Sequence, residues 1–166
     1  MDKGGKQDHE GVIRQMEKSF TNDGVIIAKV MKDHLNKWAK KPSEIALEDL
    51  GKNVPSMMIQ QLSSAEKKRE YVNGSYIGVW SFALYIRVDG NDTASRLDAI
   101  GCLNAAAEWL MQKDATGAFS NLPTIDSGRT ATRIDLASTP SIAARYADGT
   151  EDYQAIMSLE YKVRRK

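Results

Sequence analysis

Few residues in this chain have the types and the spacing that catalysis requires. The sequence contains two histidines, His9 and His34. A nucleophile activated by histidine needs an imidazole that the fold holds firmly, and His9 lies in a polar segment rich in glycine. His34 falls on the apolar stripe of an expected helix, which favours a partly buried structural histidine. We therefore expect a protein that is not an enzyme and that has no catalytic residues.

A group of acids near the C-terminus is the second candidate for chemistry. The stretch DGTED (148–152) contains three carboxylates, and hard cations such as Ca²⁺ prefer such oxygen ligands. The full spacing of an EF-hand is missing, and Asp148-Gly149 is also typical of a turn whose acids stay solvated. We expect no metal and no cofactor. The alternative is a small metal-assisted hydrolase that uses four acids: Asp126, Asp148, Glu151 and Asp152.

Two basic segments raise the question of phosphate binding. DSGRTATR (126–133) has arginines after a glycine, but it lacks the GxxxxGK[ST] pattern and leads into an expected strand, which favours a turn. The terminal KVRRK (162–166) carries four cations. Such a tail contacts solvent, a protein partner or nucleic acid, and we see no interleaved aromatic platform beside it. The net charge of +1 does not indicate bulk binding to nucleic acid.

Length and composition indicate one globular domain. The chain has 166 residues, of which 42% are hydrophobic and 27% charged, and a chain of this size can bury a core without disulfides. The single cysteine, Cys102, fits a reducing compartment. We expect residues 1–20 to form a flexible arm or a short helix, without a signal peptide, and residues 21–166 to form the domain. No apolar run approaches the roughly 20 residues that span a bilayer, so we expect no membrane partner.

Hydrophobic periodicity predicts an α+β fold in the order α-β-β-α-β-β. Residues 24–41 and 93–112 carry the apolar stripes of helices. The segments expected to be strands are 56–62, 76–89, 130–138 and 152–164, and those expected to be connections are 43–55 and 65–75. Both faces of segment 76–89 are largely apolar, which indicates a central strand. We expect a four-stranded, mainly antiparallel or mixed sheet with both helices on one face.

The segment before the last expected strand is the most distinctive connection in the chain. Residues 139–150, TPSIAARYADGT, would form a loop of about a dozen residues, and loops of that length in compact domains are usually functional. Ile142, Arg145 and Tyr146 would be exposed there, and Tyr and Arg are frequent at interface hot spots. The loop therefore predicts docking to a protein rather than catalysis.

Two stretches of the sequence resemble one family. Residues 138–164, STPSIAARYADGTEDYQAIMSLEYKVR, resemble the C-terminal signature of small proteins of tailed phages of Gram-positive bacteria, usually called minor capsid or tail-completion proteins. The shared features are a strand, then T-P-S, an aromatic residue with D-G-T-E-D, and an alternating strand. Residues 85–110, YIRVDGNDTASRLDAIGCLNAAAEWL, fit the same family, with a strand that leads through a polar turn into a long helix. The resemblance covers residues 56–165, and the family is similar to tail terminators.

This resemblance implies a structural protein that forms a hexameric ring on the last ring of the tail tube, stops tube growth and joins the tail to the head or neck. The implied partners are further copies of the chain, the tail tube protein and a head-completion or neck protein, with non-specific contact to DNA in the channel. The implied location is a virion or a phage-tail-like particle assembled in the cytoplasm of the bacterial host. The residues expected at protein interfaces are Arg129, Arg133, Arg145, Tyr146, Asp148, Gly149 and Asp152, and Arg164 and Arg165 are further candidates to line the channel.

Two other roles agree with the same residues. A head-completion or neck connector protein of the same particle would contact the portal or the DNA, and its position in the particle separates it from a terminator. A peptide-binding module that uses a sheet edge would stay monomeric at every concentration.

Overall fold

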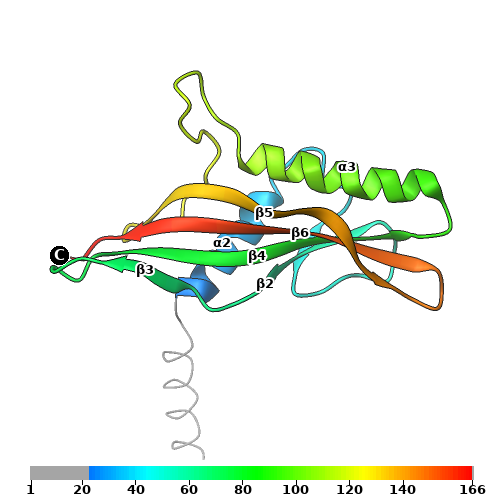
Figure 1. The fold of residues 1–166 in the computed structure, drawn as a ribbon, viewed down its shortest axis with the longest axis horizontal. Helices are drawn as coiled ribbons and strands as arrows, with labels where there is room; N and C mark the ends of the chain where they lie inside the picture. Colours follow the sequence, from blue (N-terminus) through cyan, green and yellow to red (C-terminus); the bar gives the residue numbers. More distant parts are fainter. Residues whose placement is uncertain (1–22, 166) are drawn as a thin grey trace, which may run out of the picture.

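The computed structural model describes residues 23–165, so the predicted arm, residues 1–20, lies outside the described part of the chain. The described residues form an α+β fold with two helices and six strands (Figure 1). In chain order, the elements are α2 (Asp23–Leu35), β1 (Ile45–Leu47), β2 (Ser56–Gln61), β3 (Glu66–Glu70), β4 (Tyr76–Asp89), α3 (Thr93–Leu110), β5 (Arg129–Arg145) and β6 (Thr150–Val163).

The strands form one mixed sheet in the order β1-β2-β4-β6-β5, and β3 also pairs with β4. β1 runs parallel to β2, and the other pairs are antiparallel. The prediction of four strands was wrong, because β1 and β3 lie in the segments 43–55 and 65–75 that we expected to be connections. β1 has only three residues, and all five residues of β3 (EKKRE) are exposed and charged. Neither segment therefore shows the alternation that marks a strand in a sequence.

β4 is a central strand, as its apolar faces predicted. It pairs with β6 over its whole length, from Tyr76 opposite Val163 to Asp89 opposite Thr150. One of its faces is fully buried, and its large apolar side chains are Trp80, Phe82, Leu84, Ile86 and Val88. Alternate residues of β6 are buried on the same face. The paired apolar side chains of these two strands therefore form the base of the core.

Both described helices pack on this buried face of the sheet. In Figure 1, α2 lies behind the strands and α3 runs alongside β5 and β6, while no described helix crosses in front of the sheet. His34 of α2 stacks on Trp109 of α3, with 4.9 Å between the ring centroids, and donates from Nε2 to the carbonyl oxygen of Asn121 at 2.9 Å. Burial lowers the pKa of His34. The contacts agree with the structural role predicted for this residue.

α2 ends at Leu35, well before its predicted end at residue 41. The side chain of Asn36 bonds to the backbone of Ile45 in both directions: Nδ2 donates to the carbonyl oxygen at 2.9 Å, and Oδ1 accepts from the amide at 2.8 Å. These two bonds satisfy the backbone of β1 in place of a neighbouring strand. The chain therefore turns after Leu35 although the helical pattern of the sequence continues.

α3 begins where predicted, and its buried residues are Ala99, Leu103, Ala106, Ala107 and Leu110. The Asp92 carboxylate caps the helix by accepting from the amide of Ala94 at 2.9 Å. Leu97 is 65% exposed, whereas Ala99 and Ala106 are fully buried. The alanines of this face let the helix lie close to the strands, and Leu103 and Leu110 fill the core beside them.

β5 is longer than predicted and includes most of the expected loop. The strand continues to Arg145, so only Tyr146–Gly149 remain as a turn before β6, and the prediction of a loop over residues 139–150 was wrong. The pairing of β5 with β6 shifts register at four places between Ala131 and Ala144. Such bulges break the alternation of apolar and polar residues, which explains why this part of the strand resembles a loop in the sequence.

Candidate functional site

The residues predicted for protein interfaces lie at two separate places along the β5–β6 hairpin. Arg145, Tyr146, Asp148, Gly149 and Asp152 lie at its closed end, which we call the hairpin end. The other two, Arg129 and Arg133, lie in the first part of β5. A straight strand over residues 129–145 would span up to about 50 Å. The predicted residues therefore do not form one continuous site.

Asp152 is buried at the hairpin end beside Arg87 and Tyr146. Arg87 donates from Nε and Nη2 to the two carboxylate oxygens at 2.7 and 2.9 Å, and the Tyr146 hydroxyl donates to Oδ2 at 2.7 Å. The Arg87 guanidinium lies 4.8 Å from the centroid of the Tyr146 ring. The bond to Asp152 raises the pKa of Arg87 and that of Tyr146. This network holds the partly exposed ring of Tyr146 in one position.

The preceding acid, Glu151, is buried on the opposite face of β6. Arg96 donates from Nη2 to Oε1 at 2.8 Å, the Tyr153 hydroxyl donates to Oε2 at 2.8 Å, and Arg145 Nε lies 3.5 Å from Oε1. Burial favours a raised pKa, but the bonds from Tyr153 and Arg96 outweigh it and lower the pKa of Glu151. The ion pairs of Glu151 with Arg96 and of Asp152 with Arg87 thus join the ends of β4, β6 and α3.

The four acids of the hydrolase alternative do not converge. Glu151 and Asp152 are consecutive in a strand, so their side chains lie on opposite faces of the sheet. Asp148 accepts from the amide and the hydroxyl of Thr150 at 2.9 and 2.7 Å, and Asp126 accepts from Arg129 at the other end of the hairpin. Within residues 23–165, no three side chains of metal-ligating type come together. The geometry gives this alternative no support.

A tight turn, Tyr146–Gly149, closes the hairpin end. The Gly149 amide donates to the carbonyl of Tyr146 at 3.0 Å, and the Gly149 carbonyl accepts from the amide of Gly90 at 2.8 Å. Gly149 has a φ of +90°, which glycine adopts without strain. A Cβ at this position would lie 2.6 Å from Nδ2 of Asn91. Both the backbone conformation and the contact with the loop before α3 therefore require glycine.

β5 lies at the end of the strand order, so one side of its backbone pairs with no described strand. Residues 136–144 of this edge, LASTPSIAA, contain no charged side chain, and we call them the neutral edge. Proteins usually protect sheet edges with charges, prolines or bulges, because an unpaired edge is a template for another chain. The neutral edge has Pro140 and several bulges but no charge. It therefore opposes contact with a second chain less than the charged strand β3 does.

A shallow hollow of about 390 Å³ lies beside the neutral edge, on the face of the sheet that neither described helix covers. Met58, Tyr85, Ala143 and Tyr146 contribute to its lining. Tyr146, in the lining, is 44% exposed, and Ile142 of the neutral edge is 39% exposed but pairs with Tyr153 and so lies on the other face of the sheet. An aromatic ring held by a fixed guanidinium, with the exposed Ala143 beside it and the acids Glu48 and Asp49 across the hollow, is typical of a protein-binding surface.

Arg129 is bound within the fold. It donates from Nε to Asp23 and from Nη1 to Asp126, each at 2.7 Å. Asp23 also accepts from the hydroxyls of Tyr76 and Tyr161. Burial favours a raised pKa for Asp23, but the bonds from Tyr76, Arg129 and Tyr161 together lower it. Arg129 therefore fastens the start of α2 to the sheet and is a weaker candidate for an interface than Tyr146.

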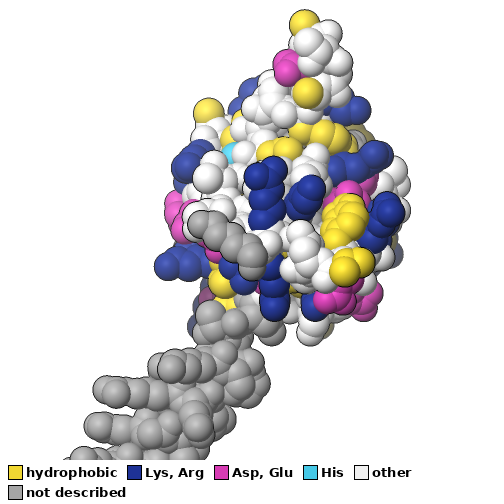
Figure 2. Space-filling model, turned by 90° about the vertical axis from the view of Figure 1, so that its left-hand side faces the viewer, with side chains coloured by type: hydrophobic (Ala, Val, Ile, Leu, Met, Phe, Trp, Pro, Cys, Tyr) yellow, Lys and Arg dark blue, Asp and Glu magenta, His cyan; other side chains and the backbone are white. Residues whose placement is uncertain are grey.

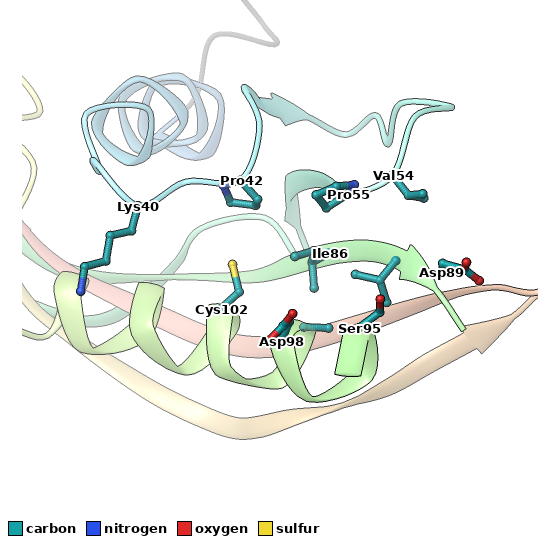
Figure 3. A pocket seen from close by; sticks show the side chains of 11 residues that line it. Lys40, Pro42, Val54, Pro55, Ile86, Asp89, Ser95, Asp98 and Cys102 are labelled. Carbon is teal, nitrogen blue, oxygen red and sulfur yellow. The ribbon is translucent and has the colours of Figure 1, made fainter. Parts of the chain in front are cut away.

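A second hollow, of about 400 Å³, lies between α3, the end of β4 and the segment before β2 (Figure 3). Pro42, Pro55 and Ile86 supply apolar walls, and Asp98 and Cys102 of α3 face it. Burial raises the pKa of the Cys102 thiol, so at neutral pH the sulfur is a thiol rather than the nucleophilic thiolate.

Sequence reasoning missed Arg87 and Arg96, the two arginines that hold the buried acids of the hairpin end. Arg87 lies directly opposite Asp152 in the pairing of β4 with β6. That pair becomes visible in the sequence once the register of these two strands is fixed, because facing residues share one side of the sheet. Arg96 reaches Glu151 from a helix, and no local spacing signals such a contact.

Comparisons with known proteins do not identify a family. No protein-family model matches the chain, and no curated protein matches it. In the described part of the chain, neither helix combines the length and the apolar character of a membrane span. Ideas about function therefore rest on the resemblance in the sequence and on the geometry of β5 and the hairpin end.

Proposed function

We propose that this protein is a structural assembly protein that binds other protein subunits through the neutral edge and the hairpin end. The observation that carries the proposal is a sheet edge without charge over residues 136–144, beside the fixed ring of Tyr146. The unpaired backbone of such an edge gains hydrogen bonds when a second chain lies against it. Binding of a second chain at the neutral edge would break no buried ion pair, because Asp152 and Glu151 keep their arginine partners within the fold.

The resemblance to phage tail-completion proteins makes the proposal more specific, as a tail terminator that acts as a homo-oligomeric ring. In a ring, each subunit contacts its two neighbours through two different surfaces, in a head-to-tail manner. The ring closes if the rotation between neighbouring subunits adds up to a full turn. The neutral edge and the hollow beside it supply one such surface. The mechanism would be capping: the ring binds the last ring of the tail tube and offers no surface to which a further tube ring can add.

The oligomeric state in solution tests this proposal. Light scattering of the full chain over a concentration series, with negative-stain images of the same samples, should show rings of about six subunits, the number that the resemblance implies. Ile142→Lys places a charge on the neutral edge and should reduce the mass to that of a monomer. The matched control is Leu97→Lys, which adds the same charge at an exposed leucine of α3 and should leave the rings intact.

Purified tail tube from the same particle provides the second part of the test. If the chain stays monomeric alone, the terminator proposal requires that it bind one end of the tube and that Ile142→Lys abolish this binding. Binding to the portal instead of the tube would place the protein in the neck. If the chain neither self-associates nor binds the tube or the portal, the assembly proposal is overturned.

A further inference from the structure

The end of the molecule opposite the hairpin end carries a dense group of cations. It consists of residues 67–75, which are most of β3 and the turn to β4, and the neighbouring residues 162–165, and we call it the basic tip. Figure 2 views the molecule from this end, where Lys and Arg side chains gather around small apolar patches. Ser75 and Arg165 join the two segments, because the Arg165 amide donates to the Ser75 hydroxyl at 3.0 Å.

Most cations of the basic tip have no acidic partner. In β3, Lys67 and Lys68 lie 3.6 and 3.1 Å from carboxylates. Four further cations form no ion pair within residues 23–165: Arg69, Lys162, Arg164 and Arg165. Three of these four are exposed, and Lys162 is half-buried. A set of neighbouring cations without counter-charges creates a positive potential that attracts an anion with several charges.

An aromatic ring lies among these cations. Tyr71 is 37% exposed, with the Arg69 guanidinium 5.3 Å and the Lys162 ammonium 5.9 Å from its ring centroid. The next residue, Val72, is fully exposed at the tip of the turn. A hollow of about 680 Å³ is lined by Tyr71, Val72, Lys162, Arg164 and Arg165. The interleaved aromatic residue that we did not see in the sequence of the tail is thus supplied by the β3–β4 turn.

We propose that the basic tip binds nucleic acid, with Lys162, Arg164 and Arg165 at backbone phosphates and the Tyr71 ring against a base. Proteins that bind single strands without sequence preference combine cations that follow the backbone with aromatic rings that stack on bases. An acidic protein segment would pair with the cations, but it would leave the exposed ring of Tyr71 without a matching group. The stacking contact is what favours nucleic acid over acidic peptide.

Fluorescence anisotropy of the full chain with a labelled oligothymidylate, at low and then rising salt, tests this inference. The variant K162A/R164A/R165A should bind at least about tenfold more weakly and show a salt slope smaller by about 2, as expected for three lost phosphate contacts to a single strand. Tyr71→Ala should weaken binding about tenfold, whereas Tyr71→Phe keeps the ring and should bind like the wild type. Urea unfolding verifies that each variant is folded.

The matched control removes three exposed cations elsewhere. K29A/K37A/K52A changes the net charge equally, at positions without an ion pair in the described residues, and should keep the salt slope of the wild type. Equal losses in both triple variants would mean that only net charge matters and would overturn the site. Equal competition by polyglutamate of matched charge would assign the tip to acidic protein instead. Ring formation is measured separately, so its failure would not affect this result.

Discussion

The two ends of the sheet use their charges in opposite ways. At the hairpin end, the acids Glu151 and Asp152 are only 3% and 4% exposed, and arginines bind both of them. At the basic tip, Arg164 and Arg165 are exposed and have no acidic partner among residues 23–165. A charge that is buried must be paired if the fold is to stay stable, whereas an exposed charge contributes little to stability. The charges of the hairpin end therefore stabilise the fold, whereas those of the basic tip are exposed on the surface.

This difference also separates the two proposed contacts. At the hairpin end, the paired charges hold the exposed Tyr146 ring beside the exposed Ala143 of the neutral edge. Such a surface suits a protein partner, since interface cores contain aromatic residues and few unpaired charges. The unpaired cations of the tip suit a polyanion, whose affinity depends on salt.

The strongest test of the comparison is to leave a charge at the hairpin end without its partner. Asp152→Ala removes the bidentate partner of Arg87, which is only 24% exposed. We expect a loss of about 3 kcal/mol in the free energy of unfolding, because an unpaired, largely buried charge is left behind. Urea unfolding measures this loss.

Two further variants decide whether the loss comes from the unpaired charge. Asp148→Ala removes a nearby acid that is exposed and bonds only within its own turn, and it should cost much less than Asp152→Ala. Replacing both partners, in R87M/D152L, should restore part of the stability, since no charge is then left unpaired. A double variant that is less stable than Asp152→Ala would show that the pair itself stabilises the fold.

The next effect in size concerns the turn that shapes the hairpin end. Gly149→Ala introduces a Cβ 2.6 Å from Asn91 Nδ2 at a φ of +90°, so we expect a loss of about 1–2 kcal/mol. Gly101→Ala is the control, because a Cβ there meets no atom within 4 Å and alanine favours a helix. Thermal unfolding of both variants should show a lower midpoint for the first and an equal or higher midpoint for the second.

The sequence predicted the features of this fold that depend on local periodicity, and it missed those that depend on pairing. The apolar faces of β4 and the alternation of β6 are local signals, and both are present. The extent of β5 was hidden because its bulges interrupt the alternation. The contact of Arg96 with Glu151 depends on how α3 crosses the sheet, and no spacing in the sequence contains that information. Tyr71 lies beside the terminal cations only when β4 pairs with β6, which places Ile77 opposite Lys162, so the basic tip too was visible only in the fold.

Asp23, a paired carboxylate near the basic tip, should make the stability of the fold depend on pH in acidic solution, with a smaller effect. The pKa of Asp23 is lowered from 3.8 by its bonds in the folded state, so its ionised form stabilises the fold above that pH. This contribution is lost as the pH falls below 3.8 and through the folded pKa, because the unfolded state then binds the proton more readily. Asp23→Asn keeps an acceptor for Tyr76 and Tyr161 but cannot titrate. Its urea midpoint should fall less than that of the wild type between pH 5 and pH 3, and equal falls would contradict the assignment.

The same network should also make the fold less stable as the pH rises in alkaline solution. Burial and the bond to Asp23 raise the pKa of Tyr76 to about 12. Between pH 10 and about 12 the unfolded state therefore loses the tyrosine proton before the folded state does, and stability falls. Tyr76→Phe should reduce this fall, as measured by urea unfolding at pH 9 and pH 11. A variant with the full alkaline loss of the wild type would mean that another group causes it.

The smallest expected effect completes the comparison of the two ends. Arg164→Ala removes an exposed cation that has no acidic partner in the described residues, so the urea midpoint should stay at its wild-type value or rise slightly as like charges separate. Arg87→Ala removes a cation of the same type from a buried carboxylate and should lower the midpoint strongly, because Asp152 is then left buried with only the Tyr146 hydroxyl as partner. If the two substitutions lowered the midpoint equally, Arg164 would hold a contact that stabilises the fold and would be less free to bind a phosphate. If only Arg87→Ala does so, the cations of the tip are available to a partner at no cost to the fold.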